Sequence, residues 1–392
     1  MFRRSESCST VSIILPPEMM LRVAELLSRR DGATGLLWRA RGTIVHEHWL
    51  KAWLPPISPS KSMLQLIIPD SEVAPFVREV VELTNLDHQA LGAVFSVRSE
   101  RAFFGPDFPQ WPTRAEALNA SPPPALKENL HALHCVVSHK LIDRVCKAAI
   151  DAGAHGPIVA FAEGRGLRDR LGWLRITKEH EKEVATVLCD DDARDAVFSA
   201  IADAGNLHLP GRGFLYDSVV ERGLFNLPSR AAPRHHDASL QQIVAAIDKL
   251  QGHTHWRDHS IVPVGSQGQA VGLERATRAT SELTQYRLAA TVLSEQAPAL
   301  IDLLLDSGAP GLTLSRARLV GADDDAFYGE THLARECTMI QVIATEAVVA
   351  ALAAAVEDYG EQQGITHLCV ALTPVTQVVT YQPGRINYRR AR

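Results

Sequence analysis

Two glycine- and arginine-rich segments carry the residue types best suited to chemistry in this chain. Glycine turns let backbone N–H groups approach an anion closely, and guanidinium groups match phosphate or carboxylate oxygens in two-point geometry. The first segment contributes Gly164, Arg165, Gly166, Arg168 and Arg170, and the second contributes Pro210, Gly211, Arg212 and Gly213. Either segment alone also fits an ordinary turn. Their joint occurrence in one short region predicts an anion-binding site.

The histidine, aspartate and cysteine clusters of the sequence do not predict a metal site or a catalytic site. The histidine-rich stretch 253–259 lacks the ligand spacing of a zinc site, so we predict a solvated or partner-facing turn and no metal site. The aspartates at 190–192 are expected to cap a helix. The 6 cysteines include no C-x-x-C pair, which is typical of reduced core thiols. No order of serine, cysteine, histidine and aspartate argues for a catalytic set, and we predict no catalytic residue.

A repeated turn indicates the elements that must position the two segments. The pattern Gly-Ala-x-Gly occurs at 32–35, 153–156 and 308–311, each time after an amphipathic run and before an apolar run. Its first glycine is expected to end a helix in the left-handed conformation. Residues 11–35, 132–156 and 287–311 then align without a gap as strand, helix and strand. The predicted apolar stripes are Leu21, Ala24 and Leu27; Val145, Ala148 and Ala149; and Leu300, Leu303 and Leu304.

A second strand–helix–strand unit follows each of the first. The predicted strands are 64–68, 184–189 and 339–344, the helices are 71–83, 191–204 and 346–359, and the final strands are 93–97, 214–219 and 369–375. The final strands share a predicted register at Ser96, Ser218 and Pro374. Two interleaved units of this kind form a four-stranded antiparallel sheet with both helices on one face. This is the ferredoxin-like arrangement of the α+β class.

Each such sheet leaves one face bare, and apolar residues there need cover. We predict that the three bare faces pack on one another, giving a monomeric single-chain pseudo-trimer. Three independent units on one string are the alternative. The predicted boundaries are domain 1 at 9–104, a proline-rich linker at 105–130, domain 2 at 131–228, a linker with one helix at 229–286, domain 3 at 287–383 and a basic tail at 384–392.

Composition narrows the possible partners. The chain has a net charge of −5, with 46% hydrophobic and 22% charged residues, which is an ordinary globular balance. A negative net charge argues against a nucleic-acid partner. No apolar stretch approaches the ~20 residues that cross a bilayer, and the first residues lack a signal-peptide pattern. We therefore expect a cytoplasmic protein.

The middle of the chain resembles the PII signal-transduction family, and in particular its PII-like branch with a shortened signalling loop. The residues that carry the resemblance are Glu163-Gly164-Arg165-Gly166-Leu167-Arg168-Asp169-Arg170-Leu171-Gly172, Glu181-Lys182-Glu183, Ala200-Ile201-Ala202-Asp203-Ala204-Gly205, Pro210-Gly211-Arg212-Gly213-Phe214 and Val219-Val220-Glu221. The first and third copies resemble the family only in the order of strands and helices and in the Gly-Ala-x-Gly turn.

The resemblance implies a ferredoxin-like trimer that binds ATP, ADP or AMP in clefts between subunits. It assigns the segment from Gly164 to Arg170 to the signalling loop, and the segment from Pro210 to Gly213 to the loop that holds phosphate. It implies no metal beyond Mg with ATP, and a signalling protein rather than an enzyme. The nucleotide, with bicarbonate or another small anion, would control a partner such as a membrane transporter or its cytoplasmic subunit. An inorganic-carbon uptake system is one example, and it would bring the protein to the inner membrane through that partner.

The first and third copies depart from the family pattern. Gln89-Ala90-Leu91 and His367-Leu368-Cys369 stand opposite Gly211-Arg212-Gly213, so we expect one complete nucleotide site. The tail contains Arg385, Arg389 and Arg390, but their order does not match the basic residues that the family uses near its C-terminus. Two alternatives stay open: a slow ATP-hydrolysing enzyme with Glu163 or Asp169 as base, and a scaffold that has lost its ligand.

Overall fold

The computed structural model describes residues 2–5, 7–30, 32–43, 60–86, 92–108, 111, 126–166, 181–226, 284–321 and 335–380. These residues contain six α-helices and a large antiparallel sheet, and they all belong to one compact unit. The predicted helix of the 229–286 linker, the histidines at 253–259 and the basic tail lie outside the described residues.

The helices and strands fall into three successive sets with the same element order. The first set is β2 (Cys8–Leu15), α1 (Pro17–Ser28), β3 (Thr34–Gly42), β4 (Ser60–Pro69), α2 (Asp70–Thr84) and β5 (Gly92–Ser99). The second is β7 (Leu130–Ser138), α3 (His139–Asp151), β8 (Ile158–Gly166), β9 (Glu181–Asp190), α4 (Arg194–Gly205) and β10 (Gly213–Val220). The third is β12 (Gln285–Leu293), α6 (Ala297–Asp306), β13 (Gly311–Gly321), β14 (Glu336–Thr345), α7 (Glu346–Gln362) and β15 (Leu368–Val375).

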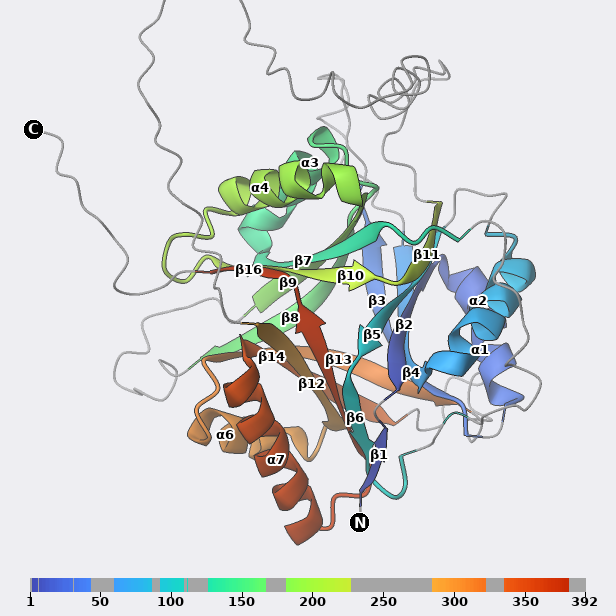
Figure 1. Cartoon of the computed structure of the whole chain (residues 1–392), viewed down its shortest axis with the longest axis vertical. Coiled ribbons are helices and arrows are strands. Elements are labelled where there is room, and N and C mark those ends of the chain that lie inside the picture. Colours follow the sequence, from blue (N-terminus) through green and yellow to red (C-terminus); the bar gives the residue numbers. More distant parts are fainter. Residues whose placement is uncertain are drawn as a thin grey trace, which may run out of the picture. The chain divides into compact units, whose positions relative to one another are not determined.

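Within each set the strands follow the ferredoxin-like order, with the fourth strand at one edge and the second at the other. The orders are β5-β2-β4-β3, β10-β7-β9-β8 and β15-β12-β14-β13, and every pair is antiparallel. The two helices of each set cover the same face of its sheet (Figure 1), where their apolar residues share a cluster with the sheet. The predicted strand and helix order is therefore present in all three sets.

The Gly-Ala-x-Gly turn acts as predicted after the first helix of each set. Gly32, Gly153 and Gly308 have φ values of 72°, 101° and 96°, in the region that favours a residue without a side chain. The alanine that follows is fully buried in each case, at Ala33, Ala154 and Ala309. The turn thus reverses the chain and places the next strand against the helix it has just left.

The gapless alignment is wrong for the first set. Val11 packs with the helices of its set, whereas its aligned counterpart Ala132 lies in a cluster that contains no helix residue. Helix α1 ends four positions before Gly32, but α3 and α6 end two positions before their glycines, so the first set is out of phase. For the same reason Leu21 is 45% exposed, and Met20 and Val23 form the buried stripe in its place.

The predicted register of the final strands is also wrong by one residue in the third set. Ala132 pairs with Ser218, and its aligned counterpart Arg287 pairs with Thr373. Thr373 therefore occupies the position that we predicted for Pro374. The sequence pattern shared by Val219 and Val375 suggested the match, but the hydrogen-bond register decides it.

Three short strands connect the sets in a cycle. After its fourth strand each set continues into a strand that pairs with the fourth strand of another set: β6 (Arg101–Phe104) with β15, β11 (Arg222–Asn226) with β5, and β16 (Gln377–Thr380) with β10. A further strand, β1 (Arg3–Ser5), pairs with β6. Each fourth strand, which would otherwise expose an unpaired edge, is therefore satisfied by a neighbouring set.

The second strands of the three sets also meet. β3 pairs with β8, and β13 pairs with both of them. Helix-free faces of the sheets pack where the sets adjoin. Ile14 and Phe95 share one cluster with Ala132 and Leu188, and Leu36 shares another with Ala289 and Met339. The faces that lack helices are thus covered by one another.

Both ends of the predicted 105–130 linker pack against the rest of the chain. Phe108 and Trp111 are buried, and the Trp111 ring lies edge-on to Phe76 of α2 with ring centroids 4.7 Å apart. At the other end Lys127 exchanges backbone hydrogen bonds with Gly223. Residues 112–125 lie outside the described part.

We expect Phe95→Ala to lower the free energy of unfolding by about 3–5 kcal/mol, because Phe95 is 1% exposed and supports both β5 and the ring of Phe225 in β11. Phe161→Ala is the matched control, since Phe161 is 72% exposed and its loss should cost less than about 0.5 kcal/mol. Urea denaturation followed by circular dichroism measures both. Equal effects of the two variants would contradict this packing scheme.

Candidate functional site

The first glycine–arginine segment is an edge strand where it is described. Gly164, Arg165 and Gly166 are the last residues of β8, and they pair with Thr313, Leu312 and Gly311 of β13. The prediction that these residues begin a loop after the second strand is therefore wrong, because all three lie within that strand. The reason is that β13 supplies a partner strand that the sequence of the second set alone does not reveal. Arg168 and Arg170 lie outside the described residues.

An ion-pair cluster surrounds Arg165 at the junction of the second and third sets. Its guanidinium lies 3.9 Å from a carboxylate oxygen of Glu163, and Arg316 of β13 lies 3.3 Å from the other oxygen. Arg165 is 44% exposed and Arg316 is 81% exposed, so both remain accessible to solvent. Exposed pairs of this kind contribute little to stability, about 0–1 kcal/mol. A dissolved anion can therefore compete with Glu163 for these arginines.

The second segment is an exposed turn that leads into β10. Pro210, Gly211 and Arg212 are exposed, and Gly211 has a φ of 76°. Gly213 has a φ of 127°, and a Cβ placed on it would lie 1.9 Å from the carbonyl oxygen of Val136. Gly213 is thus required by the close approach of β7, independently of any ligand. Arg212 is the residue of this turn whose side chain is free of such a packing role.

The two segments lie at the same end of the second sheet but on opposite edges. β9 and β7 separate β8 from β10, so the segments are about 14 Å apart by strand spacing. A ligand that contacts both segments must therefore span this distance. What lies between them at this end is the start of β9 and the N-terminus of α3.

A buried carboxylate occupies that intervening region. Glu183 of β9 is 1% exposed, and its oxygens lie 3.1 Å from His139 Nδ1 and 3.4 Å from the Arg41 guanidinium. Arg41 comes from β3 of the first set and also contacts Asp143 at 3.3 Å. This cluster ties the first and second sets together beside the predicted site. Glu183 belongs to the PII-like sequence pattern, but no pattern in the sequence indicates that it meets Arg41.

A second buried network lies where the third set adds β16 to β10. Asp217 is fully buried, and it accepts hydrogen bonds from Thr376 at 2.6 Å and from Arg194 Nε at 2.9 Å. His131 Nδ1 lies 2.9 Å from the same carboxylate, and its Nε2 lies 3.0 Å from Asp191. A protonated imidazolium can donate to both carboxylates. Sequence reasoning missed this network because Thr376 reaches it only through the pairing of β16.

The pKa values of this network follow from its contacts. The hydrogen bond to Asp217 is the main cause that raises the pKa of His131, against the opposing effect of burial. Burial disfavours the charged form of Asp217, but hydrogen bonds from His131 and Thr376 outweigh it and lower its pKa. The aspartates at 190–192 do lie at the start of a helical segment, because Asp190 is the N-cap residue of a 3-10 turn (Asp191–Ala193) that leads into α4. Their side chains make no cap hydrogen bond there: Asp191 binds His131, and Asp190 lies 3.1 Å from Lys127.

Other predicted features have simple outcomes within the described residues. All 6 cysteines are buried and unpaired, and burial raises the pKa of Cys146 to about 12. In the described part, no group of three or more metal-ligating side chains is placed to hold a metal ion. None of the helices there has the length and apolar character needed to span a membrane. The Gln89-Ala90-Leu91 triplet lies outside the described residues, and His367 contacts Arg335.

Gly213→Ala should destabilise the protein by about 2–4 kcal/mol, because the new methyl group meets the Val136 carbonyl and the backbone conformation disfavours a side chain. Gly166→Ala, in the other segment, should change the free energy of unfolding by less than about 0.5 kcal/mol, since nothing lies within 4 Å of its added Cβ. Thermal and urea unfolding compare the two. A stable Gly213→Ala variant would contradict the described strand approach.

The His131 network should make stability depend on pH in a defined direction. Because the folded pKa of His131 is raised, its contribution is fully present below the unfolded value of about 6.5 and is lost as pH rises through the folded pKa. His131→Gln should therefore cost roughly 1.5–3 kcal/mol near pH 6 and progressively less at higher pH. The exposed His208→Gln variant is the control, and its effect on the free energy of unfolding should not decrease in this way as pH rises. A stability loss in His131→Gln that grows as pH rises would refute the assignment.

Comparison with known proteins assigns the chain to no family. No family model matches the chain, and no curated protein matches its sequence. Similar solved structures include PII from Arabidopsis thaliana bound to citrate, with 18% identity over 24% of this chain and 80% of that chain at a TM-score of 0.19. Aspartate kinase from Synechocystis has 8% identity over 95% of this chain and 44% of that chain, also at 0.19. A mutant chlorite dismutase from Candidatus Nitrospira defluvii has 11% identity, 64% and 92% coverage and a TM-score of 0.16. Because these TM-scores are far below 0.5, they carry no argument about this chain, and its fold rests on the strand order and register described above.

Proposed function

We propose that this chain is a PII-like signalling protein that binds an adenine nucleotide at its second set and thereby regulates a protein partner. The three sets would be PII-like units at 9–104, 131–228 and 287–383, arranged as a single-chain pseudo-trimer. One competent nucleotide site is proposed per chain, with ATP, ADP or AMP as ligand and Mg only as the companion of ATP. The protein would act as a regulator and not as an enzyme.

The cyclic strand exchange supports the pseudo-trimer. β6, β11 and β16 each follow the fourth strand of one set and pair with the fourth strand of another, so the three connections are equivalent. The mutual pairing of β3, β8 and β13 repeats the same relation between second strands. Equivalent contacts in a closed cycle are what a cyclic trimer produces.

The observation that carries the nucleotide proposal is the position of both glycine–arginine segments at junctions with the third set. Gly164 pairs with Thr313 of β13, and Phe214, directly after Gly213, pairs with Thr380 of β16. The resemblance to PII implies nucleotides between subunits, and these junctions between sets would be the corresponding locations. The basic tail 384–392 follows shortly after Thr380 in the sequence.

The charges at this end of the sheet favour an anionic ligand. Arg165, Arg316 and Arg212 are exposed, and the first two converge on Glu163. Phosphate carries more charge than one carboxylate and accepts two-point hydrogen bonds from guanidinium groups. A bound nucleotide would therefore displace the exposed contacts of Glu163 at small cost.

The identity of the partner rests on the resemblance. Ligand state would alter the loop that follows Gly166, and this loop would dock on a membrane transporter or its cytoplasmic subunit, such as an inorganic-carbon uptake system. Bicarbonate or another small anion would act with the nucleotide. The mechanism is a population shift of the loop, which requires that the partner distinguish its two states.

We expect ATP, ADP or AMP to raise the thermal stability of the full chain. A nucleotide at 100 times its dissociation constant should add about 2.7 kcal/mol to the free energy of unfolding. The double variant Arg165→Ala with Arg212→Ala should abolish this shift in a thermal-shift panel. The double variant Arg22→Ala with Arg98→Ala removes the same charge from exposed positions on other elements and should retain it.

Two further measurements separate the alternatives. Glu163→Gln removes the carboxylate that competes for Arg165 and Arg316 and should tighten nucleotide binding by calorimetry. Three equivalent sites per chain would contradict the single-site proposal. No shift with any nucleotide would favour a scaffold without a ligand, and sustained turnover of ATP at saturation would favour a hydrolase.

A further inference from the structure

A buried arginine lies where the three sheets meet. Arg287 belongs to β12 and is 5% exposed. The next residues on the same face of β12, Ala289 and Thr291, carry no charge. Its aligned counterpart in the second set is Ala132. The third set therefore places a guanidinium at a position where the second set has a methyl group.

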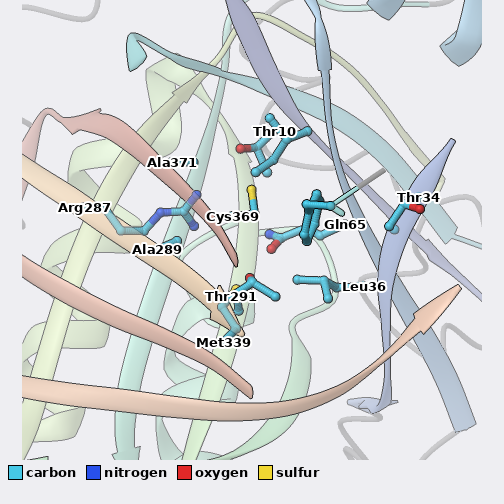
Figure 2. A pocket seen from close by; sticks show the side chains of 13 residues that line it. Thr10, Thr34, Leu36, Gln65, Arg287, Ala289, Thr291, Met339, Cys369 and Ala371 are labelled. Atoms are coloured by element: carbon cyan, nitrogen blue, oxygen red, sulfur yellow. The ribbon is translucent and has the colours of Figure 1, made fainter. Parts of the chain in front are cut away.

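Arg287 lines two small cavities between the sheets. Each has a volume of about 30 Å³, and both are also lined by Gln65 and Met339. The first cavity is lined by Thr10, Thr291 and Cys369, and Arg287 and Gln65 extend into it from opposite sides (Figure 2). The second is lined by His134, Thr186 and Tyr216 of the second set. A cavity of this size holds one or two water molecules or one small ion.

The guanidinium has polar contacts but no counter-charge among the described residues. Its Nη2 lies 3.5 Å from Thr373 Oγ1, its side chain hydrogen-bonds Tyr216, and its Nε has no hydrogen-bond partner there. Neither cavity is lined by a carboxylate. Asp217, whose charge acts on His134, is already bound by His131, Arg194 and Thr376.

The other titratable groups facing the cavities cannot supply a negative charge. Burial raises the pKa of Cys369 well above its usual value, so its thiol stays protonated. Burial also raises the pKa of Tyr216, which keeps the phenol neutral. Burial and the charge of Arg287 lower the pKa of His134 to about 3, so it stays neutral and adds no second positive charge. Arginine itself keeps its proton in proteins.

An uncompensated buried charge is strongly unfavourable, and one negative ion of suitable size removes the imbalance. The cavity also offers neutral donors for such an ion. The Gln65 amide nitrogen donates to Ser12 at 3.1 Å and carries a second N–H, and the lining residue Thr291 carries a hydroxyl group. The hydroxyl of Thr10, which also lines the cavity, lies 3.0 Å from that of Ser99. These groups resemble the mixed set of one guanidinium and several neutral donors that desolvated anions require.

We propose that the first cavity, at the junction of the first and third sheets, binds one small monovalent anion, of the size of chloride or nitrate, with the Arg287 guanidinium as its charged donor and Gln65 facing it. The guanidinium carries one positive charge, so a monovalent anion balances it. The cavity volume excludes phosphate esters and nucleotides. The site is separate from the glycine–arginine segments, so it stands or fails independently of the proposed nucleotide binding.

The test is thermal unfolding of the full chain without nucleotide, titrated with sodium chloride or sodium nitrate at constant ionic strength. Sodium gluconate, whose anion is too large for the cavity, balances the ionic strength. Above the dissociation constant, each tenfold increase in chloride or nitrate should raise the midpoint by about 2–4 °C. Arg287→Met, which preserves bulk without charge, should remove this dependence. The exposed Arg98→Met should leave it intact.

A second experiment keeps the proposal falsifiable if Arg287→Met does not fold. Gln65→Leu should then weaken the dependence on chloride and nitrate while keeping the fold, and a bromide-soaked crystal should give an anomalous peak in the first cavity, beside the Arg287 guanidinium. The same unfolding midpoint in chloride, nitrate and gluconate would overturn the proposal. So would an anion dependence that persists unchanged in Arg287→Met, or bromide peaks confined to the protein surface.

Discussion

The central constraint on this chain is that each four-stranded sheet has a face without helices and edges without partners. Isolated, each set would expose apolar side chains and unpaired backbone groups. The structure resolves both problems by the same device, because the strands that extend from one set complete the edge of another and bring the helix-free faces together. The position of every candidate site follows from this, since both arginine segments and both buried networks lie at contacts between sets.

Much of the local structure could be predicted from the sequence, because it depends on local signals. The glycine that follows each first helix marks its end, and apolar spacing marks the helix faces, so element order was predictable in all three sets. The rotational phase of the helix and strand in the first set was not predictable. The longer turn before Gly32 places Leu21 at the surface and shifts the strand that precedes α1. A one-residue shift changes which side of a strand faces the helices, and no pattern within the first set reveals it.

The candidate site was predictable by residue type and not by geometry. Arg165 and Arg212 were identified because glycine and arginine occur together, but the partner strands β13 and β16, which flank them, come from a distant part of the chain. The same long-range pairing creates the Asp217 network, which no spacing within the second set could indicate. Arg287 did leave a local signal, since a charged residue interrupts an otherwise apolar strand, and buried charges usually have a reason.

The single covalent chain has a consequence for what can stand where the sheets meet. An assembly of identical subunits must present every side chain three times at such a place, and three guanidinium groups would repel one another in a space that admits one or two waters. Here one arginine, one glutamine and one histidine come from different sets. Because the three sets belong to one polypeptide, the same framework can be repeated three times while the side chains where the sheets meet differ from set to set.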